Sequence, residues 1–408
     1  MMSGINDSIK LALVVDSFYP SKTSIAIQMF DLAKEMVDLG VEVTIFVPDE
    51  KVAKGEFVET YSLSGIDVVH VRSGKIKNVN YVVRAFREIL MPWQMILNLK
   101  RSNYSLKNWD GVVWYSPSIF ISFFATYLAK VSAAKTYLIL RDIFPQWALD
   151  VGLLSKGPAY YFFRMVEKYQ YRSADRIGVQ AAGDVGYFES ENLTILDKVE
   201  VLNNWRTKPV MQSSRSLIKN SLIAGREIFI YSGNIGAAQN LYTFVEAAEV
   251  LMPRKDIGFL FIGGGSEKDK IRDLVKSKKL DNFVVLDEIA HEDLPSLYLD
   301  CRCGIISLDI NLSTHNIPGK FLSYLYSGLP VIANINPGND LETIVNKYEV
   351  GRCISTIDPF EIARQIVSMV DTMDSGNIRD RCEALVREQF SSRNAAIQIL
   401  KSFDAWRN

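Results

Sequence analysis

The sequence lacks the cysteine and histidine patterns that mark disulfide-stabilised or zinc-binding proteins. Its 408 residues contain only three histidines and four cysteines, which are Cys301, Cys303, Cys353 and Cys382. The cysteines show no C-x-x-C spacing and no histidine cluster accompanies them, so we predict neither a zinc site nor a disulfide framework. Reduced thiols of this kind are typical of a cytoplasmic protein, which is the localisation we expect.

Excess charge and an export signal are also lacking. The formal net charge is −1, which gives no reason to expect a nucleic-acid partner. We expect no signal peptide, because the first residues do not combine an apolar stretch with a small-residue cleavage site. One uncharged run, Gly111–Ala129, reaches the length of a membrane span, but Pro117 divides it. We therefore expect a strand, a turn and a buried helix there.

Three phosphate-binding motifs are missing. The sequence contains no G-x-G-x-x-G after a strand, which disfavours a nicotinamide dehydrogenase, and no G-x-x-x-x-G-K-[ST]. It also contains no Asp-x-Asp, the paired carboxylates that usually hold a cation on a diphosphate. We accordingly expect a reaction that needs no metal and no cofactor.

Strand-like and helix-like runs alternate along the chain, which predicts parallel, doubly wound sheets. The alternation restarts after a polar, proline-containing stretch at residues 203–216. We therefore predict an α/β protein with two Rossmann-like domains, residues 1–205 and 206–392, with a final helix at 393–408 that packs back on the first domain. The expected strands are Leu11–Val15, Val41–Val47, Val68–Arg72, Val112–Tyr115, Tyr137–Leu140, Ile177–Gln180, Ile228–Tyr231, Gly258–Ile262, Val284–Leu286, Cys303–Ser307 and Val331–Ala333.

The second half carries the features of an anion site. Two glycine-rich turns, "GNIGAAQN" from Gly233 and "GGGSEK" from Gly263, each follow a strand and precede a helix. A third helix is predicted from Pro318 to about Ser327, with Lys320 just inside it. Free N–H groups at a helix start attract anions, and Lys320 would add a full charge. The alternative for Lys320 is a solvated helix lysine.

The motifs "SGNIGAAQNL", "FIGGGSE", "HEDLPSLYLDC" and "PGKFLSYLYSGLPVIA" resemble the family 4 glycosyltransferases of GT-B fold. "LRDIFPQWALDVGLL" and "VLNNW" are similar to the branch that transfers amino sugars, such as fucosamine, in bacterial O-antigen, lipopolysaccharide and capsule synthesis. The resemblance implies two domains facing across a cleft, with a UDP-sugar on the C-terminal domain and an acceptor on the N-terminal one. It also implies a retaining, metal-independent transfer.

Three residues are candidates for catalysis from their positions: Asp142 directly follows the strand "YLIL", and His315 and Lys320 lie just before and just inside the Pro-Gly helix start. Asp142 would orient the acceptor hydroxyl or act as a base; its alternative is a cap for the following turn. His315 would contact the donor, or else is an ordinary loop residue. The candidate donor-binding residues are Gly233, Asn234, Gly236, Gln239, Gly264, Asn316, Gly319, Ser323 and Glu342.

The sequence departs from the family at four of these positions. His315 and Ser323 stand where the family has two glutamates, and Asn234 and Gln239 stand where it tends to have an arginine and a lysine. Ser323 would make only a neutral hydrogen bond to the ribose, and Glu342 is a candidate to replace the lost carboxylate. Lys320 would supply the missing charge beside the diphosphate, with a second cation from Arg206 or Arg141.

Basic and aromatic residues alternate in two stretches of the first half, residues 72–107 and 158–172. This composition suits helices that lie peripherally on an anionic membrane, here the inner face of the cytoplasmic membrane. An acceptor carried on polyprenyl diphosphate would need such a face. The alternative is a buried helix face with a solvated back. The candidate acceptor and membrane residues are Arg84, Arg87, Lys100, Arg101 and Arg141.

Two other functions remain open from the sequence. A UDP-sugar 2-epimerase shares the GT-B fold, although it would want acidic and histidine groups in its site. A catalytically inactive partner that binds the donor is the other, because both family glutamates are missing.

Overall fold

The computed structural model describes residues 8–21, 23–74, 81–190, 195–206, 218–219, 221–290, 292–312, 317–373 and 377–404. The chain forms two compact units. Unit 1 comprises Met1–Leu149, Leu154–Asn204 and Ser392–Asn408, and unit 2 comprises Asp150–Leu153 and Trp205–Ser391.

Unit 1 is built on one sheet that, within the described residues, has eight strands in the order β3-β4-β2-β1-β5-β6-β7-β8. Its elements are β1 (Lys10–Val14), α1 (Ser24–Asp38), β2 (Glu42–Asp49), β3 (Val58–Leu63), β4 (Ile66–Arg72), α2 (Tyr81–Lys100), η1 (Asn103–Leu106), β5 (Gly111–Ser116), α3 (Ile121–Ser132), β6 (Lys135–Leu140), α4 (Gln146–Asp150), α5 (Pro158–Ser173), β7 (Arg176–Val179), α6 (Ala182–Ser190), η2 (Leu196–Lys198), β8 (Val199–Val201) and α14 (Ser392–Asp404).

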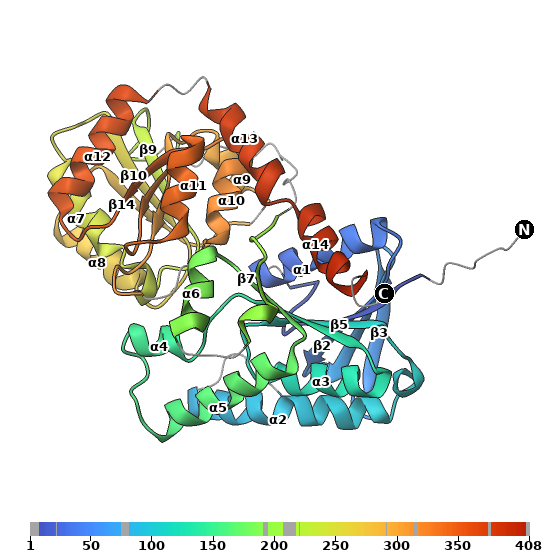
Figure 1. Cartoon of the computed structure of the whole chain (residues 1–408). Coiled ribbons are helices and arrows are strands. Elements are labelled where there is room, and N and C mark those ends of the chain that lie inside the picture. Colours follow the sequence, from blue (N-terminus) through green and yellow to red (C-terminus); the bar gives the residue numbers. More distant parts are fainter. Residues whose placement is uncertain are drawn as a thin grey trace, which may run out of the picture. The chain divides into compact units, whose positions relative to one another are not determined.

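Helices cover both faces of this sheet, which explains why every residue of β5 is buried. Helices α2, α3 and α5 line one face, while α1 and α14 pack together on the other (Figure 1). The C-terminal helix α14 therefore completes unit 1 although it is last in the sequence. The uncharged run Gly111–Ala129 forms β5 and most of α3, as expected from Pro117.

The outermost strand of unit 1 differs from the parallel pattern. β3 pairs with β4 in antiparallel register, from Val58 opposite Val71 to Leu63 opposite Ile66. Ser64 and Gly65 connect them with positive φ values of 52° and 81°, the conformation of a tight hairpin turn. Because β3 lies at an edge, half of its residues are exposed and its sequence carries no apolar run.

Unit 2 contains a second sheet, entirely parallel across its described strands, in the order β11-β10-β9-β12-β13-β14. Its elements are β9 (Glu227–Ser232), η3 (Ala237–Gln239), α7 (Tyr242–Val250), β10 (Ile257–Ile262), α8 (Lys268–Ser277), β11 (Phe283–Leu286), α9 (Leu294–Tyr298), β12 (Cys303–Ser307), α10 (Gly319–Tyr326), β13 (Val331–Asn334), α11 (Asp340–Tyr348), β14 (Gly351–Ile354), α12 (Pro359–Thr372) and α13 (Ile378–Gln389).

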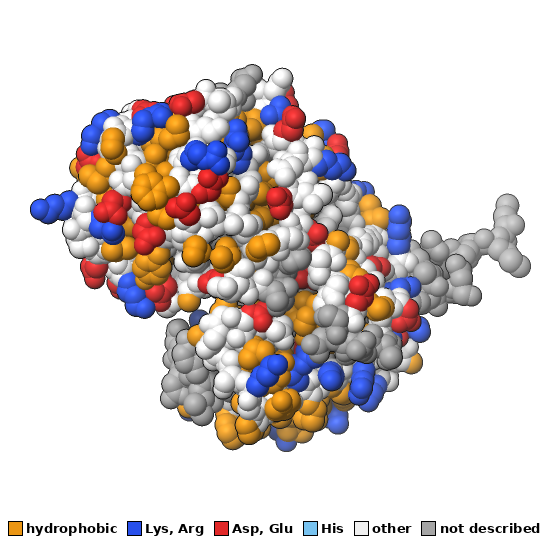
Figure 2. All heavy atoms as spheres, turned by 60° about the vertical axis from the view of Figure 1, so that its left-hand side comes forward, with side chains coloured by type: hydrophobic (Ala, Val, Ile, Leu, Met, Phe, Trp, Pro, Cys, Tyr) orange, Lys and Arg blue, Asp and Glu red, His pale blue; other side chains and the backbone are white. Residues whose placement is uncertain are grey.

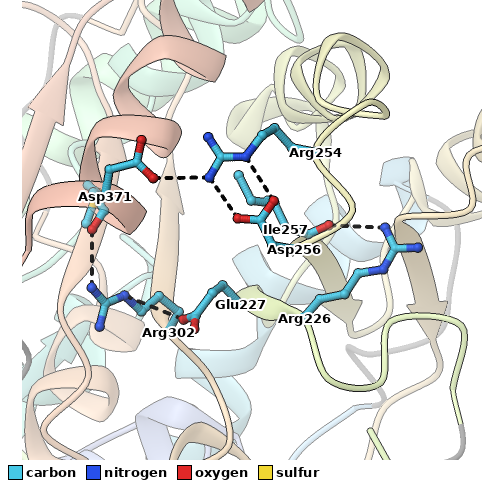
Figure 3. A network of polar contacts seen from close by, with 8 residues as sticks. Arg226, Glu227, Arg254, Asp256, Ile257, Arg302 and Asp371 are labelled. Carbon is cyan, nitrogen blue, oxygen red and sulfur yellow. Dashed lines mark hydrogen bonds and ion pairs between the residues drawn. The ribbon is translucent and has the colours of Figure 1, made fainter.

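Ion pairs gather at the amino edge of the unit 2 sheet (Figure 3). Arg254 forms two hydrogen bonds with Asp256, at 2.9 and 2.7 Å, and a third with Asp371 on α12 at 3.1 Å. Arg302 donates to the backbone oxygen of Met373 at 2.6 Å, just beyond the end of α12. These contacts tie α12 to the strand starts. The glycine-rich turns lie at the opposite, carboxyl edge of the same sheet.

Helices long and apolar enough to cross a bilayer are not found in the described part of the chain.

Candidate active site

The two glycine-rich turns of unit 2 lie directly against each other. The N–H of Gly233 donates to the oxygen of Ile262 at 2.9 Å, and the N–H of Ile235 donates to the oxygen of Gly264 at 2.7 Å. Gly263 has a φ of 154°, and a Cβ added there would lie 1.8 Å from the Gly233 oxygen. Only glycine therefore allows the two backbones to approach in this way.

These turns follow β9 and β10, and the loop after β12 joins them. The N–H of Asp309 donates to the oxygen of Ala238 at 2.9 Å, which connects that loop to η3. β9 and β12 are neighbours in the sheet, and the chain proceeds in opposite directions on either side of them. In doubly wound sheets, ligands bind outside the carboxyl ends of the strands at such a switch point.

Lys320 lies at this point. Helix α10 begins at Gly319, after Pro318 at the N-cap, whose side chain cannot cap the helix. The Lys320 Nζ atom lies 3.7 Å from the centroid of the Tyr231 ring, and a Cβ on Gly233 would lie 3.7 Å from the same Nζ. A flexible side chain is thus held between a strand end and a glycine turn, which fixes the position of its charge.

The ammonium group of Lys320 has an unfavourable environment in the free protein. Burial lowers its pKa from the ordinary 10.5 to about 7. Among the described residues no carboxylate forms an ion pair with it. Since burial disfavours the charged form, an anion bound beside Lys320 would raise this pKa again. The arrangement suits a phosphate-bearing ligand.

Ser323 contacts a residue that the motif did not contain. Its hydroxyl accepts a hydrogen bond from the guanidinium of Arg206 and donates to the oxygen of Gly319 at 3.3 Å. The backbone oxygen of Arg206 in turn accepts from the hydroxyl of Tyr326 on the same helix. Arg206 therefore places a second cation beside Ser323. Ser323 lies about one helical turn after Lys320 on α10.

The side chains of Asn234 and Gln239 are engaged within their own turn. The Gln239 amide oxygen accepts from the N–H of Gly236 at 3.1 Å and from Asn234 Nδ2 at 3.2 Å. A Cβ on Gly236 would lie 2.8 Å from that same Nδ2. These contacts hold the backbone of the turn in place.

Other expected donor residues are less well placed or lie outside the described residues. Glu342 is exposed in the first turn of α11. Burial, with a contribution from Glu342, raises the pKa of the Cys353 thiol to about 12, so the carboxylate lies toward edge strand β14. Gly264 lies in the second glycine turn, where a Cβ would meet Glu288 at 2.7 Å. His315 and Asn316 lie outside the described residues.

Unit 1 presents a pair of carboxylates at its own carboxyl edge. Asp142 follows β6 and Asp16 follows β1, on either side of β5. Burial and then the charge of Asp16 raise the pKa of Asp142 to about 6. β1 and β5 form the switch point of this sheet. A carboxylate with a pKa near neutrality is suited to proton transfer, whereas the sequence had indicated only Asp142.

Arg141, the neighbour of Asp142, is buried. It donates to the backbone oxygens of Leu202 at 2.8 Å and Asn203 at 3.4 Å, at the end of β8. Arg141 was expected among the acceptor and membrane residues, or as a second cation for the diphosphate; its guanidinium is buried and held by these backbone oxygens of unit 1. In the structure Arg141 holds the segment that leads out of unit 1. Its positive charge also lowers the pKa of Asp142, which partly offsets the larger effect of burial.

The described side chains of the expected membrane residues lie on or just after α2. Arg87 is half-buried, whereas Lys100 and Arg101 are exposed, with their charges 5.4 Å from the Tyr127 ring and 5.6 Å from the Phe57 ring. The side chain of Arg84 lies outside the described residues. Groups of three or more His, Cys, Asp or Glu side chains that could hold a metal ion are not found in the described parts.

Comparisons with known proteins give a family match within unit 2 and two curated relatives. Residues 226–372, within unit 2, match the family described as Glycosyl transferases group 1. Two curated relatives are "Probable glycosyltransferase WbjE" of Pseudomonas aeruginosa, 20% identical over 63% of this chain, and "Putative colanic acid biosynthesis glycosyl transferase WcaI" of Escherichia coli K12, 24% identical over 60%. The matches span 65% and 60% of the lengths of these relatives.

Solved structures show the same fold. A sucrose-phosphate synthase from Thermosynechococcus elongatus is 14% identical and superimposes with a TM-score of 0.75, covering 98% of this chain and 99% of that one. Anabaena HepE in complex with UDP is 13% identical with a TM-score of 0.68, covering 97% and 100%. The fold is therefore GT-B.

Proposed function

We propose that this chain, whose unit 2 matches the group 1 glycosyltransferases, is a retaining enzyme that transfers a sugar from a UDP-sugar. The transferred sugar would be an N-acetylated amino or deoxyamino sugar, in keeping with the motifs "LRDIFPQWALDVGLL" and "VLNNW". The acceptor would be a saccharide on polyprenyl diphosphate, in the synthesis of a bacterial O-antigen or capsule. The names of the two relatives and the UDP complex of HepE support this proposal.

The observation that carries the proposal is the environment of Lys320. Departure of UDP from a sugar builds negative charge on the diphosphate, and a fixed cation in a site of low polarity stabilises that charge strongly. Lys320 lies between Tyr231 and the Gly233 turn, with no ion-pair partner among the described residues. A structural lysine would instead be paired or extended into solvent.

The proposed membrane face is supported by exposed apolar side chains on unit 1. On α2, Phe86, Leu90, Trp93 and Leu97 are 67%, 48%, 53% and 56% exposed, and their spacing puts them on one side of the helix. Tyr161 and Met165 on α5 are similarly exposed, at 64% and 61%. Hydrophobic and basic side chains lie side by side on this part of the surface (Figure 2). This combination favours peripheral binding to anionic lipid over a buried helix face.

The first test is ligand binding by the whole protein. UDP and a UDP-sugar should raise the melting temperature, because a ligand at 100 times its Kd stabilises the folded state by about 2.7 kcal/mol. Turnover of the preferred UDP-sugar with a polyprenyl-diphosphate saccharide should then be the same in excess chelator as with added Mg²⁺ or Mn²⁺.

The product distinguishes the open alternatives. NMR of a transferase product should show a new glycosidic bond that keeps the anomeric configuration of the donor. An epimerised UDP-sugar without transfer would establish the epimerase instead, and binding of UDP without any turnover would establish the inactive partner. Absence of any thermal shift with all UDP ligands would contradict the whole proposal.

Membrane binding gives a separate prediction. Replacing Arg87, Lys100 and Arg101 with serine should reduce co-sedimentation with anionic liposomes, by about 1 kcal/mol for each charge removed. Replacing Phe86 and Leu90 with serine should reduce it further, and added salt should weaken wild-type binding. A triple serine variant of Lys276, Lys279 and Lys347, exposed in unit 2, is the matched control. Equal sedimentation of all variants would leave α2 without a membrane role.

A further inference from the structure

The two central strands of the unit 2 sheet separate at the switch point. Within these two described strands, the pairing of β9 with β12 ends at Gly304 opposite Ile230. On its other side β9 stays paired with β10 as far as Ser232 opposite Ile262. Backbone groups that are buried away from water need a hydrogen-bond partner, so the last residues of β9 require one that β12 does not supply.

Tyr324 of α10 supplies that partner. Its hydroxyl accepts a hydrogen bond from the N–H of Ser232 at 3.0 Å and donates one to the oxygen of Ile230 at 3.2 Å. Burial raises the pKa of Tyr324 well above its ordinary value of 10, so the hydroxyl stays protonated and keeps both roles. A Cβ on Gly304 would lie 2.3 Å from Cδ2 of Tyr324, so glycine is needed for the ring to pass β12.

A second tyrosine, at the end of α9, extends the contact. The hydroxyl of Tyr298 lies 2.6 Å from Ser232 Oγ, which in turn lies 3.4 Å from the hydroxyl of Tyr324. The rings of the two tyrosines pack edge to face, with their centroids 5.1 Å apart. Since all three residues are buried, a chain of hydrogen bonds in a medium of low polarity attaches α9 and α10 to the end of β9.

This attachment lies one helical turn away from Lys320. Tyr324 follows Lys320 by four residues in α10, so the two side chains project from the same face of the helix. The Tyr324 hydroxyl bonds to the backbone on both sides of Tyr231, while Lys320 Nζ lies 3.7 Å from the centroid of the Tyr231 ring. The place of the ammonium group over the strand end therefore depends on how Tyr324 holds the helix.

We propose that Tyr324 is a positioning residue for the donor diphosphate, and that its hydroxyl sets the distance of Lys320 Nζ from the Gly233 turn without touching the donor. The inference rests on the proposed transferase function and adds to it a buried residue that acts through Lys320. A charge already held in place loses less freedom when an anion binds, and a small displacement of such a group is costly.

The test is a double-mutant cycle on the full chain, with UDP affinity measured by calorimetry near pH 6, where Lys320 is protonated. Tyr324→Phe should weaken UDP binding about fivefold or more in the presence of Lys320, and by less than about twofold in the Lys320→Met background. The matched control is Tyr348→Phe on α11, which removes a hydroxyl that accepts from Gln389 Nε2 at 2.6 Å and should leave UDP affinity unchanged.

Equal weakening by Tyr324→Phe with and without Lys320 would overturn the inference, because a purely structural residue behaves in that way. An unchanged affinity in Tyr324→Phe would overturn it as well. If circular dichroism shows that Tyr324→Phe does not fold, Ser232→Ala takes its place in the cycle, since it removes the hydroxyl between the two tyrosines. The same dependence on Lys320 is then expected, and its absence counts against the inference.

Thermal shift of the wild type with UDP distinguishes the two possible failures. If UDP stabilises the wild type and the effects of the two substitutions simply add, only the positioning role of Tyr324 is wrong. If no UDP ligand stabilises the wild type, the proposed function itself is wrong, and the role of Tyr324 is rejected together with it.

Discussion

Replacing Lys320 with methionine should lower turnover about 100-fold or more, the effect of removing one preorganised charge-stabilising group. Methionine keeps an unbranched apolar stem against Tyr231, so the loss would come from the charge. UDP affinity of the wild type should fall as pH rises above about 7, by up to tenfold per pH unit, because the bound anion needs the protonated lysine. The variant should lack this slope in calorimetric titrations.

The free Lys320→Met variant should be at least as stable as the wild type near pH 7.5. The folded-state pKa of Lys320 lies below its unfolded value of 10.5, so the stability linked to this group is present above that pH and is lost as pH falls through about 7. Methionine removes a charge that folding disfavours. Lys255→Met is the control, since Lys255 is exposed and paired with Asp281 at 2.8 Å, at the amino edge of the same sheet. Wild-type rates in Lys320→Met would falsify the assignment of α10 to the diphosphate.

Replacing Asp142 with asparagine should lower turnover on the order of 10²- to 10⁴-fold and change the pH–rate profile. Burial and the charge of Asp16 raise the pKa of Asp142 to about 6. Since the ionised carboxylate would accept the proton of the acceptor hydroxyl, wild-type turnover should rise with pH through about 6 and then level off. This limb should be absent in Asp142→Asn, and Asp16→Asn should shift it to lower pH, because the charge of Asp16 is one of the causes that raise the pKa of Asp142.

The stability of Asp142→Asn separates a chemical role from a cap. The folded-state pKa of Asp142 is raised above its unfolded value of 3.8, so the stability linked to it is present at low pH and is lost as pH rises through about 6. At pH 7.5 the asparagine variant should therefore melt no lower than the wild type. A lower melting temperature together with an unchanged pH–rate profile would identify Asp142 as a structural residue.

The prediction of an α/β fold with two doubly wound sheets is confirmed, because parallel strands buried on both faces appear in the sequence as continuous apolar runs. The strands that escaped prediction are all at or near sheet edges. β3 has only exposed and half-buried residues, β8 has only three residues, and β14 is half-buried throughout. Edge strands contain few apolar residues, so they are hard to recognise in a sequence. The prediction that Ile177–Gln180 is the last strand of the first half was therefore wrong, because the sheet continues to β8.

The helix start near Lys320 was predicted to within one residue. Proline, glycine and the helical spacing of the apolar residues that follow can all be recognised from neighbouring positions in the sequence. Pro318 proved to be the N-cap with extended ψ rather than the first helical residue. Contacts between residues that are distant in sequence could not be predicted, although Arg206 had been named as one of two candidates for a second cation. Arg206 reaches Ser323 across 117 positions, Tyr231 lies under Lys320, and Asp16 lies near Asp142 only because β1 and β6 both flank β5.

The sequence by itself determined the layered α/β architecture, the glycine turns at the strand ends and the lysine at the start of α10, because all three depend on neighbours along the chain. Only the tertiary structure decided what surrounds these groups. Strand order brought Asp16 to Asp142 and the two glycine turns into backbone contact, and packing lowered the pKa of Lys320 and raised that of Asp142. Burial and proximity of charges are properties of the folded arrangement, and they turn ordinary side chains into candidates for chemistry.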